Sequence, residues 1–338
     1  MKKAWVRRTG KDHTQTYRRA VQAAFLLLNL WIGAQFYLFV RYYEGASSLQ
    51  VSRPAGVEGW LPIAGMMNTK YWLITGEIPT IHPAAMFLLL TFLGLSLFLR
   101  KAFCGWLCPV GSISEYLWKL GRETFRRNFV ITKWVDIPLR SLKYILLGLF
   151  LYAVGSMAVP DLRAFLHSPY GVVADVKMLN FFRFLSMTGA IVIGVLVIGS
   201  VFVKNFWCRY LCPYGALMGL AALASPLRIR RNPDACIDCA KCAKACPSGL
   251  AVDKLVQIRS AECIGCMECV TICPAENALA MQFVPAKRPV PSWVMAAAVV
   301  VVFLGVVGMA KMTGHWDSPI PERMYEALIP RAQEFGHP

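Results

Sequence analysis

Five apolar stretches constrain the fold of this chain more than any other feature. Each is long enough to be considered a membrane-crossing helix, which needs about 20 predominantly apolar residues. They are residues 21–40, 81–99, 144–160, 184–203 and 292–310. Hydrophobic residues make up 57% of the 338 residues and charged residues only 16%, which is too apolar for an ordinary soluble domain. The sequence therefore predicts a helical membrane protein with about five spans.

Positive charge alternates with these stretches. Seven Lys and Arg residues precede the first stretch, nine lie at 100–143 and eleven at 204–290, whereas 42–80 holds two and 160–183 holds three. Because Lys and Arg gather on the cytoplasmic side of membrane proteins, we expect a multi-pass protein of the bacterial inner membrane. Its N-terminus and residues 204–290 are then cytoplasmic, and its C-terminus is periplasmic. The first apolar stretch is expected to stay in the membrane, with no cleavable signal.

The net charge of +17 does not require a nucleic-acid partner. The alternation of charged loops along the chain accounts for most of it, and attraction to anionic lipid accounts for the remainder. We therefore expect membrane lipid, and no nucleic acid, among the partners.

All twelve cysteines fall in spaced motifs, and eight of them form two copies of one pattern. The sequences "CIDCAKCAKACP" and "CIGCMECVTICP" both read C-x2-C-x2-C-x3-C-P, the bacterial ferredoxin pattern for a [4Fe–4S] cluster. In two-cluster modules the fourth cysteine of each copy serves the other cluster. The predicted ligands are Cys236, Cys239, Cys242 and Cys273 for the first cluster, and Cys263, Cys266, Cys269 and Cys246 for the second. Zinc favours paired C-x2-C with a longer spacer, and disulfides are rare in the cytoplasm.

The other four cysteines form a second kind of repeat. The sequences "FCGWLCPVG" and "WCRYLCPYG" each follow an apolar stretch. Their cysteines are Cys104, Cys108, Cys208 and Cys212. Residues spaced i, i+4 share one face of a helix, and Pro109 and Pro213 suit the first turn of a following helix. A tandem two-span repeat places both motifs at the cytoplasmic face. Four thiolates suit a further iron–sulfur site, or two sites completed by other ligands. Redox-active dithiols and plain packing are the alternatives.

These observations combine into one predicted architecture. The fold class is an all-α transmembrane bundle of about five helices, containing a two-span tandem repeat, with an inserted cytoplasmic α+β two-cluster ferredoxin-like domain. The predicted segments are a basic N-terminus at 1–20, a four-span membrane domain at 21–225, the ferredoxin-like domain at 226–285, a fifth helix at 286–310 and a periplasmic tail at 311–338.

At its cysteine motifs the chain resembles the NapH/NosR-like family of polytopic membrane ferredoxin proteins, orphan electron-transport members included. The shared pattern is four spans, a C-x3-C-P motif after the second and the fourth, and then a two-cluster ferredoxin; it covers roughly residues 15–285. The resemblance implies electron transfer from quinol toward a redox partner such as a periplasmic reductase, a cytochrome or an iron–sulfur subunit. The fifth stretch and the tail after it depart from NapH-type chains, which commonly stop after the ferredoxin.

A quinol site needs an apolar pocket and groups that accept protons. His82, His167 and Asp175 lie in the expected periplasmic loops and are the candidate catalytic residues if quinol from the membrane pool is oxidised there. Ordinary interfacial anchoring is the alternative interpretation of these side chains. The alternative function is a redox sensor, or an assembly and maturation factor for a respiratory metalloenzyme.

Overall fold

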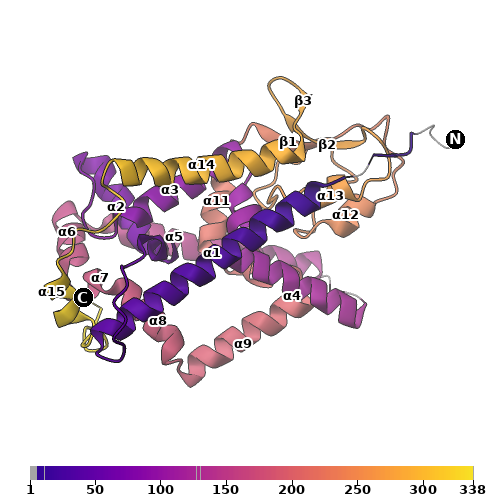
Figure 1. The fold of residues 1–338 in the computed structure, drawn as a ribbon. Coiled ribbons are helices and arrows are strands. Elements are labelled where there is room, and N and C mark those ends of the chain that lie inside the picture. The colour runs from indigo at the N-terminus through magenta and orange to yellow at the C-terminus, as the bar shows by residue number, and fades with distance from the viewer. Residues whose placement is uncertain (1–5, 11, 127, 130, 338) are drawn as a thin grey trace. The chain divides into compact units, whose positions relative to one another are not determined.

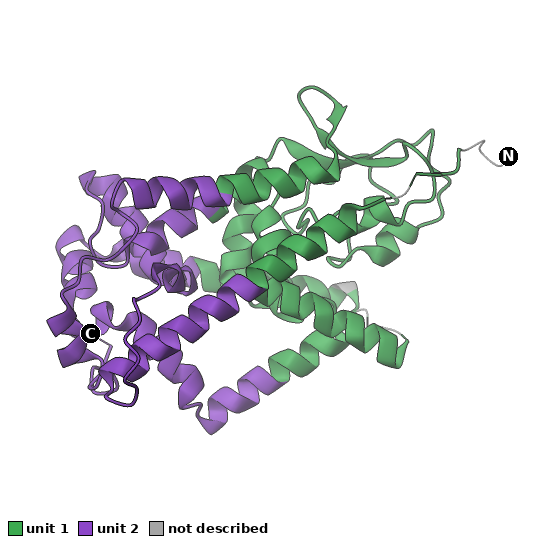
Figure 2. Ribbon diagram, viewed as in Figure 1, with its two compact units in different colours: residues 1–26, 92–147, 195–302 green, residues 27–91, 148–194, 303–338 purple. Residues whose placement is uncertain are grey.

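The computed structural model describes residues 6–10, 12–126, 128–129 and 131–337, and most of them are helical (Figure 1). Residues 1–5 and 11 of the expected N-terminal segment lie outside the described residues. The chain divides into two compact units (Figure 2). Unit 1 comprises residues 1–26, 92–147 and 195–302, and unit 2 comprises residues 27–91, 148–194 and 303–338. All twelve cysteines fall in unit 1, whereas His82, His167 and Asp175 fall in unit 2.

Three helices are long and apolar enough to cross a membrane: α1 (Thr14–Tyr43), α5 (Lys133–Ser156) and α14 (Ser292–Met312). A fourth span results if α8 (Ala174–Arg183) and α9 (Met187–Phe202), which are bent by 81° at their junction, are taken together. Among the described residues, the expected count of about five spans is therefore not confirmed.

The helix in the second expected stretch is shorter than the sequence predicted. Helix α3 (Pro83–Phe98) has 16 residues. It begins after His82 and ends before Arg100 and Lys101, and all three residues have positive φ angles. A left-handed residue cannot continue a right-handed helix, so the helix covers less than the apolar stretch at 81–99.

The third expected stretch is displaced. Helix α5 begins at Lys133, ahead of the apolar run expected at 144–160, and ends at Ser156. At that end, Lys70 donates hydrogen bonds to the carbonyl oxygens of Val154, Gly155 and Met157, at 3.0, 2.8 and 2.5 Å. These carbonyls have no partner further along the helix, so a cation that binds them stabilises the end of α5.

The ferredoxin segment of unit 1 carries a small antiparallel sheet. Its strands β1 (Leu227–Arg231), β2 (Leu279–Phe283) and β3 (Arg288–Pro289) are ordered β1-β2-β3, with Leu227 opposite Phe283. Alternate residues of β1 and β2 are buried, as expected for a sheet with one packed face. The short helices α12 (Lys241–Ala245) and α13 (Glu268–Thr271) lie between β1 and β2 in the chain, so this segment is α+β.

The remaining elements are divided between the two units. In unit 1 they are η2 (Phe103–Leu107), α4 (Pro109–Phe125), α10 (Phe206–Tyr210) and α11 (Pro213–Leu223). In unit 2 they are η1 (Ala55–Trp60), α2 (Pro62–Thr75), α6 (Val159–His167), α7 (Pro169–Val172) and α15 (Glu322–Leu328).

Candidate functional site

The two C-x2-C loops of the ferredoxin segment have the same backbone geometry. Asp238 and Ala240 in the first copy, and Gly265 and Met267 in the second, all have φ angles between 53° and 62°. Three of these four residues are not glycine, so this conformation is strained. Left-handed residues inside a loop turn successive backbone N–H groups toward one side, which makes a concavity that favours anions. Both loops therefore suit an anionic group held by the cysteines.

The cysteines predicted for the first cluster lie within electrostatic range of one another. Burial raises the pKa of Cys242 to about 11, and the nearby Cys273 contributes to this rise. Burial also raises the pKa of Cys273, and the thiols of Cys239 and Cys236 raise it further. The structure thus brings the fourth cysteine of the second copy to the first three of the first copy.

The cysteines predicted for the second cluster line one apolar cavity. Its wall includes Cys246, Cys263, Cys266 and Cys269 together with apolar side chains such as Ile229 and Leu250. Burial raises the pKa of Cys269 well above its usual value, and the other three thiols raise it further. Four thiols around one cavity form a donor set that fits an iron–sulfur cluster, because binding iron would deprotonate them. The twelve cysteines, all within the described part of the chain, are free of disulfides.

The two C-x3-C-P motifs share a helix start. Cys108 and Cys212 are the N-cap residues of α4 and α11. The sulfur of Cys108 accepts a hydrogen bond from the Gly111 N–H at 3.4 Å, and that of Cys212 from the Gly215 N–H at 3.2 Å. The positive end of each helix therefore favours the ionised form of its capping thiol.

This geometry corrects the same-face argument made from the spacing. The two cysteines of a motif do not lie on one continuous helix, because the backbone is extended at Cys108 and Cys212, with ψ angles of 118° and 104°. The proline that follows each of them disfavours helical backbone at the preceding residue. Cys104 lies instead in the π-helical turn η2, and Cys208 lies in α10.

The four thiols of these motifs nevertheless lie within electrostatic range of one another. Burial raises the pKa of Cys104 to about 11, and Cys212 adds to the rise. Burial raises the pKa of Cys108 to about 12, with contributions from Cys104 and Cys212. The pKa of Cys208 is raised by burial and by all three other thiols. Segments about a hundred residues apart in the chain therefore place these four thiols, the four-thiol group, within electrostatic range of one another in unit 1.

Two buried lysines, which sequence reasoning missed, lie within electrostatic range of the four-thiol group. The positive charges of Lys101 and Lys143 both act on Cys104 and Cys212 to lower their pKa, against the effect of burial. Burial would raise the pKa of Glu262, but the same two lysines hold it below its usual value. A lysine directly before the first motif was a visible signal for Lys101, whereas nothing in the sequence pointed to Lys143.

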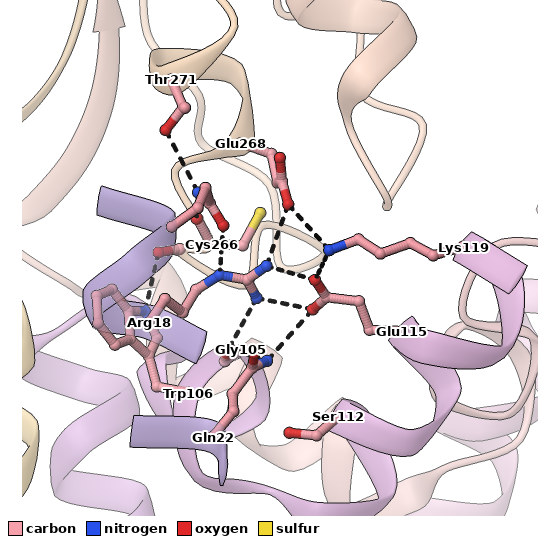
Figure 3. Close-up of polar contacts among 12 residues, drawn as sticks. Arg18, Gln22, Gly105, Trp106, Ser112, Glu115, Lys119, Cys266, Glu268 and Thr271 are labelled. Atoms are coloured by element: carbon pink, nitrogen blue, oxygen red, sulfur yellow. Dashed lines mark hydrogen bonds and ion pairs between the residues drawn. The ribbon is translucent and has the colours of Figure 1, made fainter. Parts of the chain in front are cut away.

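A polar network connects α1, α4 and the second ferredoxin loop, residues 263–269, within unit 1 (Figure 3). The guanidinium of Arg18 donates to both carboxylate oxygens of Glu115, at 2.7 and 2.5 Å, and to the carbonyl oxygen of Gly105 at 3.1 Å. It also lies 3.2 Å from a carboxylate oxygen of Glu268. Burial would raise the pKa of Glu115, but Arg18 and Lys119 lower it to about 2. Sequence reasoning did not identify this network.

Two of the three candidate proton acceptors in unit 2 belong to a buried ion cluster. Arg53 lies 2.6 Å from Asp175 and 2.8 Å from Glu58. The Nδ1 of His82 is 3.2 Å from Glu58, and its Nε2 is 2.9 Å from the carbonyl oxygen of Gly171. The structure therefore brings His82 and Asp175 together and supplies both with charged partners.

His167 has a different environment. It lines a largely apolar pocket in unit 2, together with Pro169, Val172, Arg323, Met324, Ala327 and Leu328. Most of these side chains are hydrocarbon, with one imidazole and one guanidinium at the wall. Sequence reasoning named His167 but did not identify α15 as the source of its neighbours.

Two protein-family models match the chain at these sites. A model described as a 4Fe-4S binding domain matches residues 81–128 and again residues 185–232, so it covers both C-x3-C-P motifs. A model described as a 4Fe-4S dicluster domain matches residues 228–274, which hold all eight ferredoxin cysteines.

The comparison with curated proteins decides the family. The chain is 48% identical over 349 aligned residues to YccM of Escherichia coli (strain K12), a protein named for electron transport, and the match covers 98% of both chains. The chain belongs to the NapH/NosR-like family of membrane ferredoxin proteins. It is 24% identical to the ferredoxin-type protein NapH of the same organism, over 73% of this chain and 78% of NapH. It is 32% identical to the regulatory protein NosR of Pseudomonas aeruginosa, over 48% of this chain and 22% of NosR. No solved structure matches.

Proposed function

We propose that this chain is a membrane-bound iron–sulfur electron-transfer protein that passes electrons from the quinol pool toward a respiratory redox partner. The observation that carries the proposal is that all twelve cysteines lie in one compact unit, where Cys246, Cys263, Cys266 and Cys269 line one cavity. The family relationship to YccM, a protein named for electron transport, supports the same function. The proposed location is the bacterial inner membrane, with the cysteine motifs on the cytoplasmic side and the C-terminus in the periplasm.

Three sets of residues would hold the cofactors. Two [4Fe–4S] clusters are assigned to the ferredoxin cysteines as predicted from their spacing, and a further iron–sulfur site is assigned to Cys104, Cys108, Cys208 and Cys212. Such clusters, when bound, supply one-electron transfer. The protein's own contribution at the four-thiol group is charge compensation. Lys101 and Lys143 offset the negative charge of ionised thiolates, and the N-termini of α4 and α11 stabilise Cys108 and Cys212.

The pocket around His167 is the proposed quinol site. Its apolar wall suits a quinone ring, and an imidazole is a suitable acceptor for a quinol proton. His82 and Asp175 are less available, because Arg53 and Glu58 already bind their side chains. We propose that they hold the loops of unit 2 in place.

Metal analysis of the purified full chain tests the cofactor assignment. Iron and acid-labile sulfide are measured together with EPR spectra of the reduced protein. About eight irons per chain would mean the two ferredoxin clusters alone, and about twelve would support a third cluster. A Cys108→Ser, Cys212→Ser double variant should lose only the additional iron, whereas Cys239→Ser should lose a ferredoxin signal. Full iron content in the double variant would contradict the third site.

Quinone reactivity tests the direction of electron flow. Anaerobic addition of a short-chain quinol should reduce the clusters, and His167→Gln should slow that reduction without changing the iron content. Failure of every quinone analogue to exchange electrons with the loaded protein would contradict the quinol assignment.

NosR is named as a regulatory protein, so a redox sensor or assembly factor is the second candidate function. A deletion strain distinguishes the two. Lost respiratory electron flux with intact partner enzymes supports electron transfer, and a partner enzyme that lacks its cofactor supports assembly.

A further inference from the structure

We infer that Arg18 raises, and Glu268 lowers, the reduction potential of the cluster held by Cys246, Cys263, Cys266 and Cys269. The inference rests on the proposed function, because it takes that cluster as bound. It concerns two residues outside the cysteine motifs' ligand sets, and it gives the buried polar network of Figure 3 a role in electron transfer.

Arg18 is a permanent charge inside the protein. Its side chain has no exposed surface, and a guanidinium keeps its proton under all ordinary conditions. Water and salt therefore screen its field much less than that of an exposed arginine. Its neighbour on α1, Arg19, is exposed.

Hydrogen bonds at both ends of its guanidinium fix the position of Arg18 next to the second ferredoxin loop. Gln15, one turn earlier on α1, donates to the carbonyl oxygen of Cys266 at 2.9 Å and accepts from the Nε of Arg18 at 2.9 Å. Glu115 and Gly105 hold the other end of the guanidinium. Trp106 donates to the carbonyl oxygen of Gly265 at 3.1 Å. These hydrogen bonds therefore hold the loop that carries Cys266 next to the charge of Arg18.

Both charges lie beside the loop that carries the ligands. Glu268 lies between Cys266 and Cys269 in the chain, and the guanidinium of Arg18 is 3.2 Å from its carboxylate. Gln15, which accepts a hydrogen bond from Arg18, also donates one to the carbonyl oxygen of Cys266. Reduction adds one negative charge to a cluster, so a nearby cation stabilises the reduced form and a nearby carboxylate destabilises it. The two residues therefore shift the potential in opposite directions.

The test is an anaerobic redox titration of the full chain in detergent, followed by EPR. Arg18→Gln should lower one of the potentials, with about a tenfold change in the reduction equilibrium constant, which is about 59 mV for one electron. Glu268→Gln should raise the same potential. Arg19→Gln, the matched control on the exposed side of α1, should leave every potential unchanged.

Opposite shifts of the potential would distinguish an electrostatic effect from a packing effect, because the effect of a loosened loop does not depend on the sign of the charge that was removed. An Arg18→Gln, Glu115→Gln double variant removes the buried pair together. Its potential should still fall, since the guanidinium that is lost lies 3.2 Å from Glu268 of the loop. If Arg18→Gln loses its clusters, the potentials of this double variant and of Glu268→Gln test the inference in its place.

Unchanged potentials in iron-loaded Arg18→Gln and Glu268→Gln would overturn the inference, and so would shifts of the same sign. Wild-type protein without iron would instead refute the proposed function, which makes the two failures distinguishable.

Discussion

Lys143 of α5 and Glu262 of the ferredoxin segment form a two-point ion pair, with the Nζ atom 2.7 and 2.6 Å from the two carboxylate oxygens. The Lys143 side chain has no exposed surface. Removing one partner of such a pair leaves a buried charge without compensation, which costs about 3–5 kcal/mol.

Lys143→Met should therefore lower the free energy of unfolding by about that amount. The double variant Lys143→Met, Glu262→Gln should recover most of it, because no unpaired charge remains. Thermal unfolding of the detergent-solubilised variants measures both. Equal losses in the single and double variants would show that an unpaired Glu262 carboxylate is not the source of the cost.

Gly105 lies where the first C-x3-C-P motif meets the second ferredoxin loop. A Cβ atom added there would come within 2.4 Å of the carbonyl oxygen of Ile264. Gly105→Ala should therefore push the two loops apart, with a cost of about 1–3 kcal/mol and reduced iron content.

Gly94→Ala is the matched control for this substitution. A Cβ at Gly94, in the interior of α3, meets no atom within 4 Å, and alanine is favoured over glycine in a helix. This variant should be as stable as the native chain or slightly more so. If Gly105→Ala behaved like Gly94→Ala, the close approach would not constrain the loops.

The Arg18–Glu115 pair predicts a pH dependence. The pKa of Glu115 falls from 4.5 to about 2 in the folded chain, so the unfolded chain binds this proton at higher pH than the folded chain does. The stabilisation is fully present above pH 4.5 and is lost as the pH falls toward 2. Melting temperatures between pH 7 and pH 3 should drop less steeply for Glu115→Gln than for the native chain. An equally steep decline would mean that other carboxylates account for the acid sensitivity.

The ion cluster of unit 2 predicts a strong effect of Arg53. Its guanidinium is shared by two buried carboxylates, Glu58 and Asp175. Arg53→Met would leave both without their cation and should destabilise the protein by about 3–5 kcal/mol. Arg331, in an exposed ion pair with Glu334, offers the comparison: Arg331→Met should change stability by less than about 0.5 kcal/mol. Similar unfolding temperatures for the two variants would remove the ion cluster as a source of stability.

Most of the sequence-based predictions that were confirmed came from local patterns of residues. The spacing of the cysteines predicted iron–sulfur motifs, and family models for 4Fe-4S domains match the same segments. The helical character of the apolar stretches was also predictable, because a run of apolar residues is itself the signal. The ends of these helices were less predictable, since α3 stops at left-handed residues and α5 extends into a charged segment.

The sequence by itself determined the iron–sulfur motifs and the starts of α4 and α11, because cysteine spacing and the effect of proline on its predecessor act over a few residues. Tertiary structure alone decided which charged side chains, distant in the chain, form ion pairs. Arg18 and Glu115 are 97 positions apart, and Lys143 and Glu262 are 119 apart. Such pairs form only where packing removes both side chains from water, and no local pattern encodes which buried cation will face which carboxylate.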